Sequence, residues 1–236
     1  MIKSTCLLCK KHRELKKSHI IPKLIYRYIR RRQEEKSNSP KLLQLNKKKK
    51  IFECNEKQWQ ESILCNECEQ LLSKNETDFA RILYKIHQNM ATHKQGDYCY
   101  ASNLLIQAEL NLFFNEQKAN SLRYFAASYI LRNLYLIDNS LPQIQKHELE
   151  NFILGRTKHS FHVIVKVNTG KPFNLFTSTY TLDHFDDFKH YSFIVPNIFF
   201  TVIFCLGGKK LSTPDLIIIE EDLYDDPIVN KLIRIS

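Results

Sequence analysis

Apolar residues recur at two different spacings along the chain, and these spacings predict the order of its elements. A helical repeat of apolar positions favours helices over residues 24–32, 69–86, 103–114, 118–137 and 141–154. Runs rich in β-branched and aromatic residues predict strands over residues 161–167, 191–195, 198–206 and 216–219. The chain therefore has the pattern of an α+β protein.

The N-terminal part carries shorter elements between polar stretches. Residues 15–22 read as an extended segment that stops at Pro22, because proline disfavours helical geometry in the residue before it. Residues 36–50 are polar and rich in lysine, and we predict a basic loop there. Residues 51–64 fit a hairpin that turns at residues 55–57 and leads towards the helix predicted from residue 69.

Length and composition suit one or two packed domains. The chain has 236 residues, of which 43% are hydrophobic and 25% charged. We predict a small module over residues 1–96 and an α+β domain over residues 97–236. The longest apolar stretch, residues 191–208, contains Pro196 and Asn197 and does not suit a membrane span. The first residues lack the apolar centre of a signal peptide, so we expect a cytoplasmic protein without membrane contact.

The positive charge is confined to the N-terminus. Residues 1–50 hold 17 lysines and arginines against three acids, a net +14, whereas the remaining 186 residues hold 18 against 22, a net −4. A segment this basic attracts polyanions and gains affinity by releasing counterions from phosphates, although a solvated arm or a membrane-surface contact would have a similar composition. We predict nucleic acid, with DNA ahead of RNA, as the partner. The predicted phosphate contacts are Lys16, Lys17, Arg30, Arg31, Arg32, Lys47, Lys48, Lys49 and Lys50.

Four of the seven cysteines form two CxxC pairs, Cys6 with Cys9 and Cys65 with Cys68. Two thiolates separated by two residues can reach the same ion, and two such pairs complete the tetrahedral four-sulfur shell that Zn²⁺ accepts. Redox pairs and unrelated buried cysteines are the alternatives, but a thioredoxin-like pair follows a strand in a βαβ pattern, which neither pair does. We predict a structural Zn²⁺ bound by these four residues.

The order of these motifs resembles the HNH endonuclease superfamily. The first CxxC is followed by Ser18-His19-Ile20-Ile21-Pro22 at the end of an extended segment, and the second CxxC opens a helix. The resemblance covers residues 6–86 and implies a ββα-metal unit, related to the treble clef, that is braced by the four-cysteine zinc. Residues 97–236 would then form a separate helical and β-rich α+β domain.

The resemblance assigns catalytic roles to individual residues. His19 takes the place of the general base that activates water for attack on a phosphodiester, a role that a neutral imidazole suits. Ser18 stands where the family usually has a metal ligand, Gln60 stands where it has an asparagine, and Glu69 stands where it has a histidine. These departures leave open whether the site is active.

Glu69 and Glu76 lie seven residues apart, which is about 700° of helical rotation and therefore nearly the same helix face. Two carboxylates on that face are hard oxygen ligands of the kind that holds Mg²⁺ or Mn²⁺, here opposite His19. A solvated acidic face is the alternative. Arg132, in an otherwise apolar helix, is expected to pair with a buried carboxylate, although a phosphate contact is a second reading.

The sequence thus favours a zinc-braced, metal-dependent endonuclease that cleaves DNA or RNA, in a setting such as phage defence, restriction or toxin action. The alternative is a non-catalytic zinc module that binds nucleic acid or a partner protein. A homodimer contact or a protein partner at residues 97–236 is a further expectation. No Walker motif, dinucleotide fingerprint or serine nucleophile elbow is present.

Overall fold

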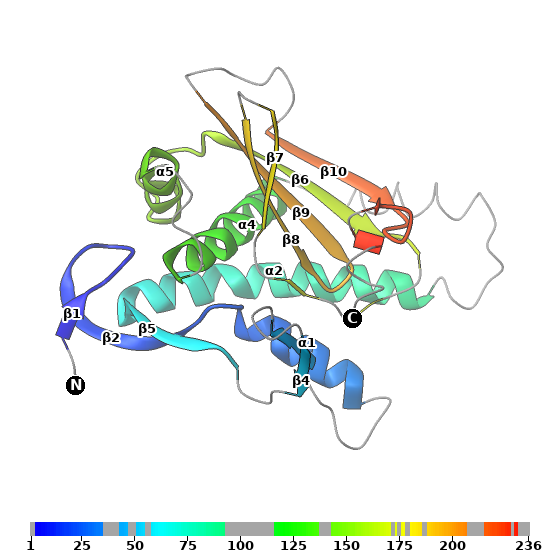
Figure 1. Cartoon of the computed structure of the whole chain (residues 1–236), viewed down its shortest axis with the longest axis horizontal. Helices are drawn as coiled ribbons and strands as arrows, with labels where there is room; N and C mark the ends of the chain where they lie inside the picture. Colours follow the sequence, from blue (N-terminus) through cyan, green and yellow to red (C-terminus); the bar gives the residue numbers. More distant parts are fainter. Residues whose placement is uncertain are drawn as a thin grey trace.

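The structure, a computed structural model, is an α+β fold in which helices cover one side of a twisted sheet (Figure 1). It describes residues 3–34, 43–46, 51–54, 58–92, 116–136, 143–170, 173, 176–177, 180–185, 188–206, 215–227 and 229–230. Within these ranges the chain forms four helices and three sheets. The predicted α+β class is confirmed, and the predicted helix over residues 103–114 lies outside the described residues.

The N-terminal elements form a three-stranded sheet of order β1-β2-β5. Its strands are β1 (Lys3–Thr5), β2 (His12–His19) and β5 (Gln60–Cys65), and both pairings are antiparallel. Pro22 ends the extended segment and α1 (Lys23–Glu34) follows, as predicted. A separate two-stranded sheet joins β3 (Leu43–Asn46) to β4 (Ile51–Cys54).

Two N-terminal predictions were wrong. Residues 51–64 do not form a hairpin, because β4 pairs with the preceding β3 while β5 returns to β2. The pairing of Leu15 with Cys65 accounts for the return, since it carries the second CxxC pair back to the first. The predicted loop over residues 36–50 contains β3, and its other residues lie outside the described ranges.

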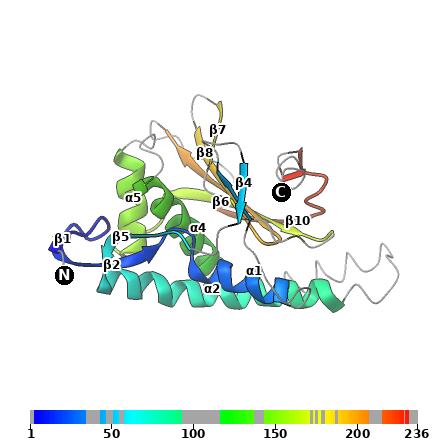
Figure 2. The same cartoon turned by 60° about the horizontal axis from the view of Figure 1, so that its bottom comes forward.

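The helices are stacked in layers beneath the large sheet. The predicted helices are confirmed as α2 (Asn66–Thr92), α4 (Glu116–Leu136) and α5 (Gln143–Ile153), although α2 is longer than expected. Figure 2 shows α4 between the sheet and α2, with α1 alongside α2. Because α4 is covered by neighbours on several sides, its buried residues include Arg123, Ser128, Arg132 and Asn133 as well as apolar side chains.

The large sheet has the strand order β10-β6-β9-β8-β7. The four predicted strands are confirmed as β6 (Phe161–Asn168), β8 (Phe188–Val195), β9 (Ile198–Cys205) and β10 (Leu216–Glu221). Pairing is antiparallel except between β10 and β6. The sequence did not predict β7 (Tyr180–Phe185), which interrupts its apolar residues with Asp183 and His184 and pairs only at the sheet edge.

Stacked aromatic rings connect α2, α4 and the large sheet. The ring of Phe79 in α2 stacks on Phe125 in α4 with centroids 3.5 Å apart, and Phe125 contacts Phe200 in β9 at 5.7 Å. Tyr129 stacks on Phe193 at 4.1 Å. One hydrophobic cluster therefore runs from Cys6 to Phe204, across the predicted boundary at residue 96. The division into domains at residues 1–96 and 97–236 stays a prediction.

Within the described residues, no helix combines the length and the apolar character that crossing a membrane requires.

Candidate metal centre and the polar cluster beside it

The first CxxC pair lies in a tight turn between β1 and β2. The backbone N–H of Lys10 donates to the carbonyl oxygen of Cys6 at 2.9 Å, and the N–H of Cys6 donates to that of Lys11 at 2.9 Å. Lys10 adopts a left-handed backbone with φ of 63°, which lets the chain reverse within a few residues. The turn brings the thiols of Cys6 and Cys9 to the same side of the backbone.

The second pair spans the junction of a strand and a helix. Cys65 is the last residue of β5, and Cys68 lies in the first turn of α2. An irregularity in the pairing of β2 with β5 leaves Ile63 out of register, and its carbonyl oxygen accepts a hydrogen bond from the N–H of Leu7 at 3.0 Å. The backbone N–H of Cys65 donates to the sulfur of Cys6 at 3.3 Å. The two knuckles are therefore held together by the backbone as well as by their thiols.

The four predicted cysteines form one cluster. Their Sγ atoms all lie within 4.8 Å of one another, and those of Cys9 and Cys65 are 3.8 Å apart. Tetrahedral coordination with Zn–S bonds of about 2.3 Å places sulfurs about 3.8 Å apart, and all four cysteines are free rather than disulfide-bonded. The geometry and the all-sulfur donor set fit Zn²⁺. Within the described part of the chain, no other group of three or more histidine, cysteine or carboxylate ligands is gathered so closely.

The thiols differ in their electrostatic surroundings. Burial alone would raise the pKa of Cys6, but backbone N–H groups of Cys65, Cys9 and Leu8 stabilise its thiolate and bring the pKa below its ordinary value. Burial raises the pKa of Cys68, and the neighbouring charges of Cys6 and Cys65 raise it further. A divalent cation offsets this mutual repulsion, as expected of a structural metal site.

The first knuckle is also attached to the helical layer, which the sequence did not predict. The ammonium of Lys10 donates to Glu150 Oε1 of α5 at 2.7 Å, and the hydroxyl of Tyr135 in α4 donates to the same oxygen at 3.0 Å. Glu150 is only 7% exposed in its side chain. A pair separated by 140 residues has no local signature in the sequence, so only the folded structure reveals it.

His19 lies at the end of β2, half-buried and opposite Gln60 of β5. The amide nitrogen of Gln60 lies 2.7 Å from His19 Nε2. Because an amide nitrogen only donates, this contact fits an imidazole that has no proton on Nε2. Burial lowers the pKa of His19 below its usual value, and the charges of Lys23 and Arg132 lower it further. A side-chain hydrogen bond with Gln58 and the charge of Glu69 act in the opposite direction, but the net pKa stays lowered. These effects together favour the neutral imidazole.

Ser18 points in a different direction from its neighbour. Successive side chains of a strand face opposite sides, and Ser18 is fully buried whereas His19 is partly exposed. Its hydroxyl donates to the carbonyl oxygen of Lys16 at 3.4 Å. Ser18 therefore belongs to the core side of β2, and its hydroxyl is directed to the backbone.

The two carboxylates predicted to share a helix face have different partners. Glu76 is buried and forms an ion pair with the buried Arg132 of α4, so the predicted pairing of Arg132 is confirmed. Burial raises the pKa of Glu76, the charge of Arg132 lowers it, and that of Glu69 raises it. Within the described part of the chain, Glu69 Oε1 is buried without a hydrogen-bond partner. The acidic face is therefore not simply solvated.

Replacing Arg132 by methionine is expected to destabilise the protein by about 3–5 kcal/mol, because Glu76 is left buried and unpaired. The loss should be largest at neutral and alkaline pH. Glu76 already has a raised pKa, and without Arg132 it rises further, so the variant should recover stability as the pH falls and the carboxyl takes up a proton. Thermal unfolding measured between pH 4 and pH 8 tests both expectations.

Arg81→Met is the matched control for that experiment. Arg81 pairs with Asp78 at 2.9 Å, but its side chain is 77% exposed, so removing the charge should cost at most about 1 kcal/mol. Equal losses of stability in the two variants would show that the buried ion pair contributes no more to stability than the exposed one.

The predicted phosphate contacts are described only in part. Lys16 and Lys17 are exposed on β2, and Lys16 also pairs with Glu14 at 2.8 Å. Arg31 is exposed on α1, Arg30 is half-buried, and the side chain of Arg32 lies outside the described residues together with Lys47, Lys48, Lys49 and Lys50. Their contact with nucleic acid stays a prediction.

A second ion-pair network, which the sequence did not predict, lies at the start of α4. Asp215 accepts from Arg123 at 2.8 Å and lies 2.5 Å from His159 Nε2. Burial would raise the pKa of Asp215, but these two partners hold it below its usual range. The side chain of His159 is only 18% exposed. The network joins α4 to the residue that precedes β10.

Comparisons with family models, with curated proteins and with solved structures yielded no significant match to this chain. The four-cysteine cluster is therefore the firmest functional feature, and the chain is not assigned to a family.

Proposed function

We propose that the chain is a zinc-braced, metal-dependent endonuclease that cleaves DNA. The observation that carries the proposal is the buried Oε1 of Glu69, which has no hydrogen-bond partner within the described part of the chain and lies one residue after the cluster cysteine Cys68. The lowered pKa of His19, on which the charge of Glu69 acts, supports it. The order β2, β5, α2, with knuckles before β2 and at the start of α2, is similar to the ββα-metal unit of the HNH superfamily. That likeness supports the catalytic roles proposed for His19 and Glu69. The main support for these roles comes from the surroundings of the two residues in this chain.

His19 is the proposed general base. A neutral imidazole with an accepting Nε2 can take a proton from water as the water attacks the scissile phosphorus. The N–H of Gln60 now occupies that position at 2.7 Å, and the O–H of the attacking water would take its place. Gln60 is exposed, so its side chain can turn aside towards solvent or towards the phosphate. It thereby holds the imidazole ready in the absence of substrate.

Glu69 is the proposed ligand of the catalytic metal. An ionised carboxylate oxygen that is buried without a donor costs free energy unless it finds a proton or a cation. Mg²⁺ and Mn²⁺ prefer such oxygens, and when bound they polarise the phosphoryl group and stabilise the leaving oxygen. Glu76 is the second proposed ligand on this helix face, although its carboxylate also serves Arg132.

Cleavage of a supercoiled plasmid by the purified protein tests the proposal. We expect no cleavage in chelator, cleavage after Mg²⁺ or Mn²⁺ is added, and loss of cleavage in Glu69→Gln. An RNA substrate in parallel distinguishes DNA from RNA as the polymer. Metal-independent cleavage, or full activity of Glu69→Gln, would contradict the proposed metal site.

The basic N-terminal segment is proposed to bind the phosphate backbone. If Lys47, Lys48, Lys49 and Lys50 contact phosphates, replacing all four by serine should reduce the dependence of DNA affinity on salt by several units of the log–log slope. We expect the fold to survive, and zinc content and thermal unfolding of the variant check this. Binding isotherms at several salt concentrations give the slope, and an unchanged slope would remove these lysines from the interface.

A non-catalytic zinc module that binds nucleic acid or a partner protein is the second candidate. Two observations favour it: Glu76 is already neutralised by Arg132, and within the described residues no second cluster of metal ligands accompanies the cysteines. Nucleic-acid binding without cleavage under every metal condition would select it. If the chain is an endonuclease, the proposed setting is phage defence, restriction or toxin action. Residues 97–236 are then proposed to contact a second copy of the chain or a protein partner.

A further inference from the structure

One face of α1 is buried and the opposite face is basic. Leu24 and Ile29 are buried in the hydrophobic cluster. Lys23, Arg27 and Arg31 are exposed and lie four residues apart, so each is turned by only about 40° around the helix axis from the one before it. These three residues therefore form one stripe, about 12 Å long, which we call the α1 stripe.

The positive charge of the α1 stripe is not offset from within the helix. Residues 23–33 contain no aspartate or glutamate, and the first turn of α1 has no acidic residue. An acidic residue ordinarily stabilises that turn, because the positive end of the helix dipole lies there. In α1 the turn carries Lys23 instead, which adds to the positive potential. A phosphate group at this end would offset both the lysine and the dipole.

The stripe begins beside the proposed catalytic residues. Strand β2 ends at His19 and α1 begins at Lys23, whose charge acts on the imidazole. Arg27 lies one turn further along α1, which runs alongside α2 (Figure 2), and its charge acts on Glu76. Because Glu76 is already paired with Arg132, the charge of Arg27 remains in excess. The α1 stripe thus extends from the proposed cleavage site along an exposed helix face.

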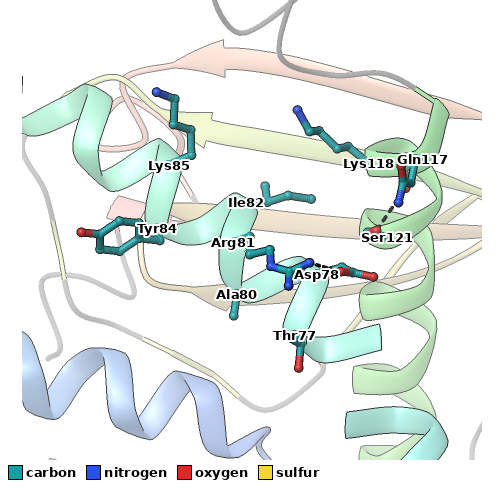
Figure 3. Close-up of a pocket in the computed structure, with 10 residues that line it drawn as sticks. All are labelled: Thr77, Asp78, Ala80, Arg81, Ile82, Tyr84, Lys85, Gln117, Lys118 and Ser121. Atoms are coloured by element: carbon teal, nitrogen blue, oxygen red, sulfur yellow. Dashed lines mark hydrogen bonds and ion pairs between the residues drawn. The ribbon is translucent and has the colours of Figure 1, made fainter. Parts of the chain in front are cut away.

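The far end of the stripe contacts α2. The guanidinium of Arg31 lies 6.0 Å from the centre of the Tyr84 ring, and Tyr84 lies on the side of α2 away from α4 (Figure 3). The ring is neutral, so this contact orients the guanidinium without cancelling its charge. Arg30 is half-buried and has other interactions, so the exposed stripe continues through Arg31.

The shape of the stripe indicates which anion it fits. A basic amphipathic helix can lie on a membrane, but it does so by inserting its apolar face among the lipids. The apolar face of α1 is buried in the protein, so α1 offers only its charge. On each strand of duplex DNA a phosphate recurs about every 3.4 Å along the axis, so a stripe of about 12 Å spans about three or four phosphates.

We propose that the α1 stripe, formed by Lys23, Arg27 and Arg31, binds successive phosphates of one strand of duplex DNA, with Lys23 nearest the proposed cleavage site. The choice of DNA as the polyanion rests on the proposed function. These contacts reach the backbone rather than the base edges, so binding along the stripe should not depend on base sequence.

Binding of a short fluorescent duplex, measured at several salt concentrations in chelator so that cleavage plays no part, tests the inference. Each phosphate contact contributes about 0.9 units to the log–log slope of affinity against salt. Lys23→Gln/Arg27→Gln should therefore lower the slope by about two units, and Arg31→Gln by about one. Lys23→Arg/Arg27→Lys, which exchanges the two cations, should keep the parent slope because both charges are retained.

Arg156→Gln/Lys158→Gln is the matched control. It removes the same two residue types from exposed positions beyond the end of α5, and it changes the net charge of the chain by the same amount. A fall in slope confined to the α1 variant is then a property of the stripe and not of total charge. Thermal unfolding and zinc content of each variant exclude misfolding as the cause.

Three outcomes in DNA binding would overturn the inference: no binding by the parent protein, an unchanged slope in Lys23→Gln/Arg27→Gln, or an equal fall in the control. Phosphatidylserine vesicles give a fourth, because a double variant that loses vesicle binding and keeps its DNA affinity would assign the stripe to a membrane surface. Failure of the proposed function looks different, since a protein that never cleaves DNA can still show the fall in slope. Conversely, a cleaving protein whose double variant keeps the parent slope retains its proposed function and loses this surface.

Discussion

Replacing Cys65 by serine is expected to remove the bound zinc and unfold the N-terminal half of the protein. Structural zinc contributes about 10–16 kcal/mol of apparent binding free energy in small zinc modules, which is comparable to the whole stability of an ordinary domain of about 5–15 kcal/mol. Cys65 joins β5 to α2 and pairs with Leu15, so its loss releases both the strand and the start of the helix. Elemental analysis should fall from one zinc per chain to none, and the unfolding temperature should fall with it.

The effect should extend beyond the knuckles. Cys6, Cys65 and Cys68 belong to the same hydrophobic cluster as Phe79 and Phe125, and Lys10 of the first knuckle pairs with Glu150 of α5. Loosening of the knuckles therefore removes contacts from α4 and α5, and hydrogen exchange should rise in these helices. Cys205→Ser is the control, because Cys205 lies at the end of β9 outside the metal cluster. Full zinc content in Cys65→Ser would refute the assignment of the ligands.

The sequence predicted most helices and buried strands because their apolar residues follow a single period. The run from Ile198 to Cys205 is apolar almost throughout and lies in the sheet interior, so no competing structure fits it. Strand β7 was missed because Asp183 and His184 interrupt its apolar residues and it pairs with one neighbour only. The hairpin error over residues 51–64 has a different cause. Strand partners are set by long-range contacts such as Leu15 with Cys65, which local patterns do not encode.

The sequence predicted best those parts of the candidate site for which the spacing of residues leaves few chemical alternatives. Two CxxC pairs leave few alternatives to one metal, and the four sulfurs are gathered as expected. Arg132 was recognised because a charge in an apolar helix requires a partner, but the sequence did not identify Glu76 as that partner. The groove lined by Ile82 and Lys85 of α2 and by Gln117 and Ser121 of α4 was not predicted, because its lining comes from two helices that are separated in sequence.

Replacing His19 by alanine is expected to abolish DNA cleavage, with a loss of about 10²–10⁴-fold if it acts as the general base. Zinc content should be unchanged, because the four sulfurs complete the zinc shell without an imidazole. DNA affinity should also survive, since the proposed phosphate contacts are lysines and arginines at other positions. His12→Ala is the control: His12 is exposed at the start of the same strand, and its loss should leave the rate unchanged. The measurement is the initial rate of plasmid cleavage at saturating metal.

Gln60→Ala sharpens the interpretation of that result. Gln60 contacts His19 Nε2 but would be displaced by the attacking water, so its loss should reduce the rate less than the loss of His19 does. If Gln60→Ala instead abolished cleavage while His19→Ala did not, the amide would be the essential group and the imidazole a structural neighbour. Unchanged cleavage in His19→Ala would remove the general base from the proposal. The zinc centre would then remain as a brace for nucleic-acid or protein binding, because none of its four ligands takes part in the proton transfer.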